Sequence, residues 1–282
     1  NEAMVSNYSI AAGKTHTYTL TITFLDKDEN QDDNQGVSFS TKVSINETKE
    51  ASSQVASSAA STIKALAATD TVNFATDDPD NNIRYIGANP NNYVYFNCSD
   101  YSNQSDSTCE KWRIIGVFKN MTKEDGSKED LVKIIRDDSL DNIKWDSNSA
   151  NDWSKASLQK TLNGEYYNGT YATGALKNDN TRNAIESVVW NLGGTDYDKT
   201  ASAYYAAERG TKVYSGRPTT WTGKIGLMYP SDYGYATSGG QINTRKSCLN
   251  SFMSSWNSMN ECFENDYLYK LYYLYQNVDE ID

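Results

Sequence analysis

The chain has 282 residues, enough for one large domain or two small ones, and its formal net charge is −11. This acidity argues against nucleic acid and anionic lipid as partners, because no basic stripe is present to neutralise phosphates. The 21 Tyr, 6 Trp and 7 Phe can supply a core and argue against global disorder. No apolar run approaches the length of a membrane span, so the chain itself is not expected to insert into a bilayer.

Residues 1–48 alternate between apolar and polar side chains in two stretches, 8–24 and 37–45. This period predicts two antiparallel strands joined by an acidic loop. The region is therefore expected to be a β-hairpin or part of a β-sandwich whose other strands lie elsewhere. The chain begins at Asn1 without a signal peptide, so an export signal or anchor is expected upstream.

The acidic loop between these strands offers oxygen ligands at alternate positions, as calcium loops do. The candidate ligands are Asp26, Asp28, Asn30 and Asp32. The loop fails the EF-hand pattern, because Gln31 stands where glycine is needed and Val37 where glutamate is needed. A solvated loop is the favoured interpretation, so no cofactor is expected and calcium is the weak alternative.

Residues 49–82 differ in composition from both neighbours. An Ala/Ser-rich stretch over 49–69 has apolar residues at helical spacing, which predicts a bridging helix. The Asp/Asn/Pro-rich stretch that follows, up to Asn82, is typical of a linker.

Residues 83–282 mix strand and helix patterns, so an α+β domain is expected. The predicted strands are 93–96, 112–118, 131–135 and 224–229, and the predicted helices are 153–163, 181–192 and 199–209. The most regular is 181–192, where Ile185, Val188, Val189 and Leu192 follow helical spacing and Arg182 can pair with Glu186. Pro230 is expected to begin a turn or a helix.

Four cysteines occur as two couples, Cys98 with Cys109 and Cys248 with Cys262. Each couple lies in a polar stretch typical of surface loops, which favours disulfides and an oxidising compartment. Four cysteines allow three pairings, and four free thiols are the alternative. A bridge across a loop of either size contributes about 3 kcal/mol in the chain-entropy model. No metal-binding spacing accompanies them.

The single histidine, His16, lies on the polar face of the first predicted strand, where acid–base catalysis is not expected. Paired carboxylates could serve a glycosidase, but the sequence singles out no pair. Five tryptophans could stack on sugars, although such residues more often belong to the core. They are Trp112, Trp145, Trp153, Trp190 and Trp221, of which Trp221 is the best candidate for exposure.

Several ordered motifs resemble large surface proteins of gut-dwelling Firmicutes and their wall-less relatives. The motifs are Arg84–Asn97, Trp112–Val117, Trp153–Tyr167 and Trp221–Thr237. The resemblance covers roughly residues 60–268 and implies a location at the cell surface more than an activity. It also places the first cysteine couple as a staple between two early strands of this domain.

Two remoter likenesses refine the expected fold. Residues 8–45 are similar to the final strands of camelysin-like and biofilm-fibre sandwich domains, and residues 226–237 resemble a strand-to-helix segment of sulfatase-modifying-factor domains. The latter are relatives of the C-type lectin fold, which implies a C-type-lectin-like domain over 83–282. The candidate ligand-binding residues, all within the Trp221–Thr237 motif, are Trp221, Asp232, Tyr233 and Tyr235.

Family members continue with further strands where residues 270–282 stand here, which leaves open whether the domain is truncated. The sequence thus predicts an extracellular or cell-surface protein for display or adhesion, which binds glycan or protein without catalysis. The alternatives are a structural subunit of a surface fibre or layer and a carbohydrate-active or modifying enzyme.

Overall fold

The computed structural model describes residues 50–149, 151–194, 197–212 and 216–269, with the backbone alone for 50–58. All of them belong to one structural unit, Glu47–Asp282. The hairpin or partial sandwich over 1–48, including His16 and the candidate calcium ligands, lies outside the described residues. The division of the chain into domains therefore stays a prediction.

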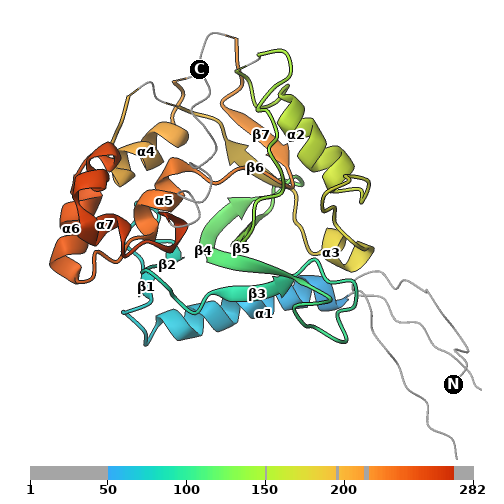
Figure 1. Ribbon diagram of the computed structural model, residues 1–282, viewed down its shortest axis with the longest axis horizontal. Coiled ribbons are helices and arrows are strands. Elements are labelled where there is room, and N and C mark those ends of the chain that lie inside the picture. The colour runs from blue at the N-terminus through green and yellow to red at the C-terminus, as the bar shows by residue number, and fades with distance from the viewer. Residues whose placement is uncertain (1–49, 150, 195–196, 213–215, 270–282) are drawn as a thin grey trace, which may run out of the picture. The chain divides into compact units, whose positions relative to one another are not determined.

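An antiparallel five-stranded sheet is the centre of this unit (Figure 1). Its longest strand, β4 (Glu110–Thr122), pairs with β2 and β3 along one edge and with β5 along the other. The remaining strands are β1 (Phe74–Ala75), β2 (Ile83–Tyr85), β3 (Tyr93–Phe96) and β5 (Lys128–Arg136). The predicted strands over 93–96, 112–118 and 131–135 are thus confirmed.

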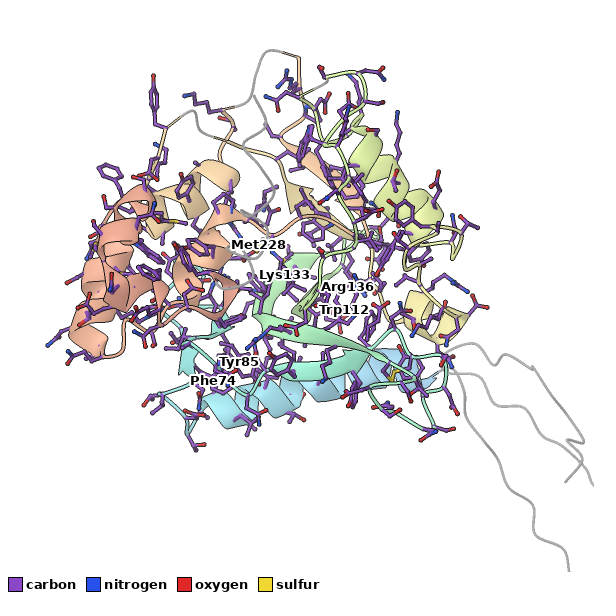
Figure 2. All side chains as sticks on the ribbon, in the orientation of Figure 1. Phe74, Tyr85, Trp112, Lys133, Arg136 and Met228 are labelled. Carbon is purple, nitrogen blue, oxygen red and sulfur yellow. A yellow bond between two sulfur atoms is a disulfide. The ribbon has the colours of Figure 1, made fainter. Side chains whose placement is uncertain are left out.

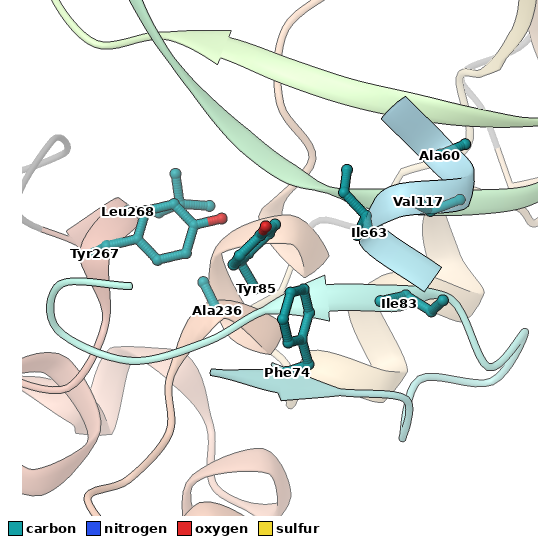
Figure 3. Close-up of a cluster of buried hydrophobic side chains, with 9 residues drawn as sticks. All are labelled: Ala60, Ile63, Phe74, Ile83, Tyr85, Val117, Ala236, Tyr267 and Leu268. Carbon is teal, nitrogen blue, oxygen red and sulfur yellow. The ribbon is translucent and has the colours of Figure 1, made fainter. Parts of the chain in front are cut away.

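Helix α1 (Glu50–Ala67) packs along this sheet and confirms the helix predicted over 49–69. It contributes Ala60 and Ile63 to the main hydrophobic core, which Figure 3 shows in close-up. Strands and C-terminal segments supply the other buried members, which are Phe74, Ile83, Tyr85, Val117, Ala236, Tyr267 and Leu268. The core therefore joins the first and last parts of the described chain.

A glycine sets the distance between two of the sheet's strands. A Cβ atom on Gly116 of β4 would lie 2.1 Å from the carbonyl oxygen of Ile83 on β2. Any larger residue would push β2 away, because real Cβ atoms never approach a backbone oxygen so closely. Gly116 therefore fixes the position of the next residue on β2, Arg84, which is central to the site described below.

The helix predicted over 181–192 is wrong. The structure has a short helix, α3 (Asp179–Asn183), and then a strand, β6 (Val188–Asn191), which pairs with β7 (Thr220–Gly223). The Asn178 side chain caps α3 by accepting a hydrogen bond from the amide of Thr181 at 3.0 Å. The β-branched pair Val188 and Val189 suits a strand, and pairing with β7 overrides the helical spacing.

The predicted pair between Arg182 and Glu186 is likewise absent. Arg182 pairs instead with Asp179 at 3.0 Å, while Glu186 lies 3.9 Å from Lys123 at the end of the β4–β5 hairpin. An isolated bridge between Lys123 and Val188 attaches the two-stranded β6–β7 sheet to the main sheet.

The predicted strand over 224–229 is also wrong, because β7 ends at Gly223. The side chain of Asn163 takes the place of a neighbouring strand there. Its Oδ1 accepts hydrogen bonds from the amides of Lys224 and Ile225, and its Nδ2 donates to the Ile225 carbonyl. One side chain thus satisfies three backbone groups, and the segment runs on to Tyr229 without a ladder.

The helix predicted over 153–163 begins later and ends later than expected. A turn organised by Asp152 occupies its start, α2 spans Ser157–Thr161, and a π-helix (η2) spans Leu162–Tyr166. Gly164 lies inside the π-helix and does not terminate it. Leu162 belongs to a hydrophobic cluster, and Leu158 packs against it.

The C-terminal part of the described chain is mainly helical (Figure 1). The predicted helix over 199–209 is confirmed as α4 (Ala201–Glu208), and Pro230 begins α5 (Pro230–Ala236). The remaining elements are α6 (Ile242–Asn250), the 3-10 helix η3 (Met253–Ser258) and α7 (Asn260–Phe263). The described residues therefore form an α+β unit.

Both predicted disulfides are present, Cys98–Cys109 and Cys248–Cys262. The first follows β3 and precedes β4, as the resemblance implied. The second joins α6 to α7, and its sulfurs pack around the fully buried Trp256. The polar context predicts cysteines in surface loops, but all four are buried, and Cys248 and Cys262 pack with Trp256.

Candidate functional site

A cleft of about 460 Å³ lies between the two-stranded β6–β7 sheet and the segments that surround it. Four stretches of chain line it: the loop after β5, the end of β6, the loop before β7 and the segment that leads into α5. The lining residues are Trp145, Asn151, Asp152, Trp153, Trp190, Asn191, Leu192, Gly193, Gly194, Lys212, Arg217, Pro218, Gly226, Leu227, Met228 and Tyr229.

Four aromatic rings line this cleft, and we call it the aromatic cleft. Trp145 lies with its ring centroid 5.3 Å from that of Trp153, and Trp190 lies 6.2 Å from Tyr229. Trp145 is 42% exposed, whereas Trp153 is buried. The cleft thus combines the exposed indole of Trp145 with three more buried rings. These are the rings of Trp153, Trp190 and Tyr229.

Hydrogen bonds fix the ring of Trp190 on β6 and the ring of Tyr229, the residue before α5. Trp190 donates its Nε1–H to the Gly223 carbonyl at 2.9 Å. The Tyr229 hydroxyl donates to the Asn191 carbonyl at 3.0 Å and accepts from the Asn191 amide at 2.8 Å. The polar atoms of both rings are therefore satisfied inside the protein, and the rings offer apolar surface to the cleft.

A second glycine allows the Trp190 ring to lie where it does. A Cβ atom on Gly226 would stand 3.0–3.1 Å from three atoms of the indole six-membered ring. The backbone at Gly226 therefore packs directly on the Trp190 ring. A side chain at this position would displace one or the other.

Asp152 is the acidic side chain among the lining residues, and its charge is compensated locally. Its Oδ1 accepts from the amide and hydroxyl of Ser154 at 3.1 and 2.7 Å, and its Oδ2 lies 3.3 Å from the Lys155 ammonium. The hydrogen bonds from Ser154 are the main reason that the pKa of Asp152 is lowered. The carboxylate thus organises its own turn.

Behind the aromatic cleft lies a buried network of ions centred on Arg84. Its Nε donates to Asp78 Oδ2 at 2.6 Å and its Nη1 to Asp232 Oδ1 at 3.0 Å. Lys133, which Figure 2 labels on β5, pairs with the other oxygen of Asp232. The guanidinium also lies 4.7 Å from the Phe118 ring centroid, so the pairs are enclosed by apolar surface.

Burial and ion pairing act against each other in this network. Burial acts to raise the pKa of Asp232, but Lys133 and Arg84 outweigh it, so the pKa is lowered. For Lys133, burial dominates over the attraction of Asp232 and lowers the pKa. Burial also raises the pKa of Glu208, which accepts hydrogen bonds from the amide and hydroxyl of Ser231.

The four ligand-binding candidates from the sequence do not converge on one surface. Asp232 is part of the buried network, and Tyr235 is buried with its ring 6.2 Å from that of Tyr205. Tyr233 is half-buried, 5.4 Å from Trp256. Trp221 is half-buried with its ring edge-on to Trp153 at 5.9 Å, and it does not line the cleft.

Sequence reasoning named Trp145, Trp153 and Trp190 among possible stacking residues but did not bring them together. It missed Tyr229 and the segment that leads to it, because that segment was assigned to a strand. The sequence signal for a helix start at this point is Tyr-Pro-Ser-Asp, residues 229–232. In the structure Asp232 accepts a hydrogen bond from the Tyr229 amide at 2.9 Å and so caps α5. In the described part of the chain, no three His, Cys, Asp or Glu residues gather as a metal site would require.

Comparisons of the chain with protein-family models, with curated proteins and with solved structures find no match. No helix in the described ranges combines the length and the apolar character that a membrane crossing requires.

Proposed function

We propose that the protein is an extracellular or cell-surface binding protein that holds a glycan in the aromatic cleft, without catalysis. The observation that carries this proposal is the meeting of three tryptophans and Tyr229 on one cleft of about 460 Å³. A volume of this size suits a small ligand rather than a protein surface.

A sugar matches the two kinds of surface in this cleft. The C–H face of a pyranose is apolar and packs on an indole, while its hydroxyls need hydrogen-bonding partners at the edge. Trp145 offers an accessible indole, and the amide residues Asn151 and Asn191 also line the cleft. The fixed rings of Trp190 and Tyr229 reduce the ordering cost of binding, because their positions are set before the ligand arrives.

Three further points support the location and the mode of action. The two disulfides suit an oxidising compartment, and the resemblance to bacterial surface proteins points the same way. A C-type-lectin-like arrangement is part of the proposal, and the α+β architecture is compatible with it. The described lining of the cleft includes one carboxylate, Asp152, whereas most glycosidases use two.

A glycan array probed with the folded protein tests the proposal, and a substitution locates the site. Trp145→Ala should weaken binding by about 2 kcal/mol, the scale of a central aromatic anchor. Phe252→Ala is the matched control, because Phe252 is 56% exposed and does not line the cleft. A blank array, or equal binding by the wild type and Trp145→Ala, would contradict the proposal. Circular dichroism should show that both variants are folded.

A further inference from the structure

We infer that the aromatic cleft binds two consecutive rings of an oligosaccharide, in two subsites that each combine aromatic surface with one side-chain amide. This inference rests on the proposed function and names the size of its ligand. The volume of the cleft is the first argument. A sugar unit packed as densely as an organic crystal occupies about 200 Å³. A cleft of about 460 Å³ therefore has room for two such rings.

The aromatic rings of the cleft form two separate pairs. Trp145 packs on Trp153, with 5.3 Å between the ring centroids, and Trp190 packs on Tyr229, with 6.2 Å between them. Among the described residues, no ring of one pair contacts a ring of the other. Because the apolar face of one sugar covers about one aromatic side chain, two separate pairs offer stacking surface for two sugars.

Each pair has a side-chain amide close to it in the sequence. Asn151 lies two residues before Trp153, and Asn191 directly follows Trp190. Both asparagines line the cleft, and neither side-chain amide has a hydrogen bond to any residue that the structure describes. An amide accepts through its oxygen and donates through its nitrogen, so it can bind two neighbouring hydroxyls of one sugar. The cleft thus offers one amide for each ring.

The two subsites belong to one continuous cleft. Leu192 follows Asn191, lines the cleft and packs against the hydrophobic cluster that contains Trp153. The end of β6 therefore connects the two aromatic pairs. Once one sugar of a linked pair is bound, the other is held at a high effective concentration near the second subsite. A disaccharide should accordingly bind more tightly than its monosaccharide.

Tryptophan fluorescence titrations of the wild type test the number of rings, because three indoles line the cleft. The probes are the mono-, di- and trisaccharides of glucose, galactose, mannose, xylose and N-acetylglucosamine. In the series that binds, the disaccharide should bind at least about tenfold more tightly than the monosaccharide, and a third ring should change the affinity less than about threefold.

The same titrations separate failure of the inference from failure of the proposed function. Equal affinities for the mono- and disaccharide would overturn the inference and leave the proposed function standing. A further tenfold gain from the third ring would overturn the assignment of two subsites. No binding in any series would overturn the proposed function itself.

Substitution of the two amides tests whether they serve different rings. Asn151→Ala and Asn191→Ala should each lower the affinity for the disaccharide by about fivefold, the scale of a neutral hydrogen bond. One of them should leave the affinity for the monosaccharide unchanged, because a single ring occupies mainly the stronger subsite. Asn243→Ala is the matched control, since Asn243 is an exposed residue of α6 that does not line the cleft.

The control should bind every probe as the wild type does, and circular dichroism should show that all three variants are folded. Equal losses for the mono- and disaccharide in both cleft variants would mean that the two amides hold the same ring, and would overturn the inference. Unchanged disaccharide binding in both would overturn it as well. The wild-type titrations decide the number of rings even where a variant fails to fold.

Discussion

Arg84 and Asp232 form an ion pair, 3.0 Å between Nη1 and Oδ1, in which each residue is only 1% exposed. The pair joins β2 to the first turn of α5, and the same arginine holds Asp78. Arg84→Met should therefore leave two buried carboxylates short of a partner and cost about 3–5 kcal/mol of unfolding free energy. Urea denaturation followed by circular dichroism would measure the loss.

The control for that prediction is Lys64→Met. Lys64 pairs with Asp130 at 2.7 Å, but its side chain is 42% exposed. Water and salt screen such a pair, so the expected loss of stability is far smaller. Equal losses in the two variants would show that burial does not govern the strength of these pairs here.

The Gly226→Ala substitution tests how the Trp190 ring is positioned. The added methyl would lie 3.0–3.1 Å from three ring atoms, so the ring or the backbone must shift. Overpacking of this kind costs typically 1–3 kcal/mol, and the binding of saccharide should weaken as well. Gly164→Ala is the control, since nothing lies within 4 Å of the added atom and alanine suits a helix better. Binding that survives Gly226→Ala unchanged would argue against a role for Trp190.

The Cys248–Cys262 bridge should be the more informative disulfide to remove. The double variant Cys248→Ala with Cys262→Ala releases α6 from α7 and loosens the cluster around Trp256. Chain entropy alone predicts a loss of about 3 kcal/mol for a loop of this size. Urea midpoints with and without a reducing agent would measure it. A wild type whose midpoint is insensitive to reduction would contradict this expectation.

Asp266 should make stability depend on pH in an unusual direction. The residue is fully buried, and burial raises its pKa well above the ordinary value, although the amides of Leu268 and Tyr269 oppose the shift. A raised pKa in the folded state means that stability is greatest in acid and falls as pH rises from the ordinary pKa of the carboxyl to its raised pKa. Asp266→Asn keeps the acceptor for both amides and should remove this fall.

Melting temperatures measured between about pH 4 and about pH 8 would test this expectation. The difference between the variant and the wild type should grow as pH rises. Glu264→Gln, which changes an exposed acid nearby, serves as the control. A constant offset between Asp266→Asn and the wild type across the range would show that folding does not raise the pKa of Asp266.

The sequence predicted the parts of this fold that local chemistry determines. The β4–β5 hairpin, the helix at Ala201–Glu208 and both cysteine pairs follow from period, turn residues and polar context. The strand β6 did not, because Val188, Val189 and Leu192 fit a helical period as well as an extended one. Pairing with Thr220–Gly223 decided the matter, and no local pattern encodes that partner.

The aromatic cleft shows the same limit at the level of function. Trp145 and Trp153 were identified as possible stacking residues from their type alone. That they meet Trp190 and Tyr229 depends on Asn163, which holds Lys224 and Ile225 in place of a strand neighbour. Such a side-chain contact between distant segments leaves no periodic signal. The ion pairs of Arg84 with Asp78 and Asp232 could not be predicted from the sequence for the same reason.

The position of β4 within the sheet determines how its amide protons exchange with solvent. Its backbone pairs with β2 and β3 on one edge and β5 on the other, and its Val117 is fully buried. Amide protons in such a strand exchange with solvent only when the surrounding structure unfolds as a whole. Deuterium uptake along β4 should therefore report global unfolding, whereas the cleft segment over 226–228, which belongs to no helix or strand, should exchange by local motion. Ligand capture and global stability would then be measurable separately in one exchange experiment.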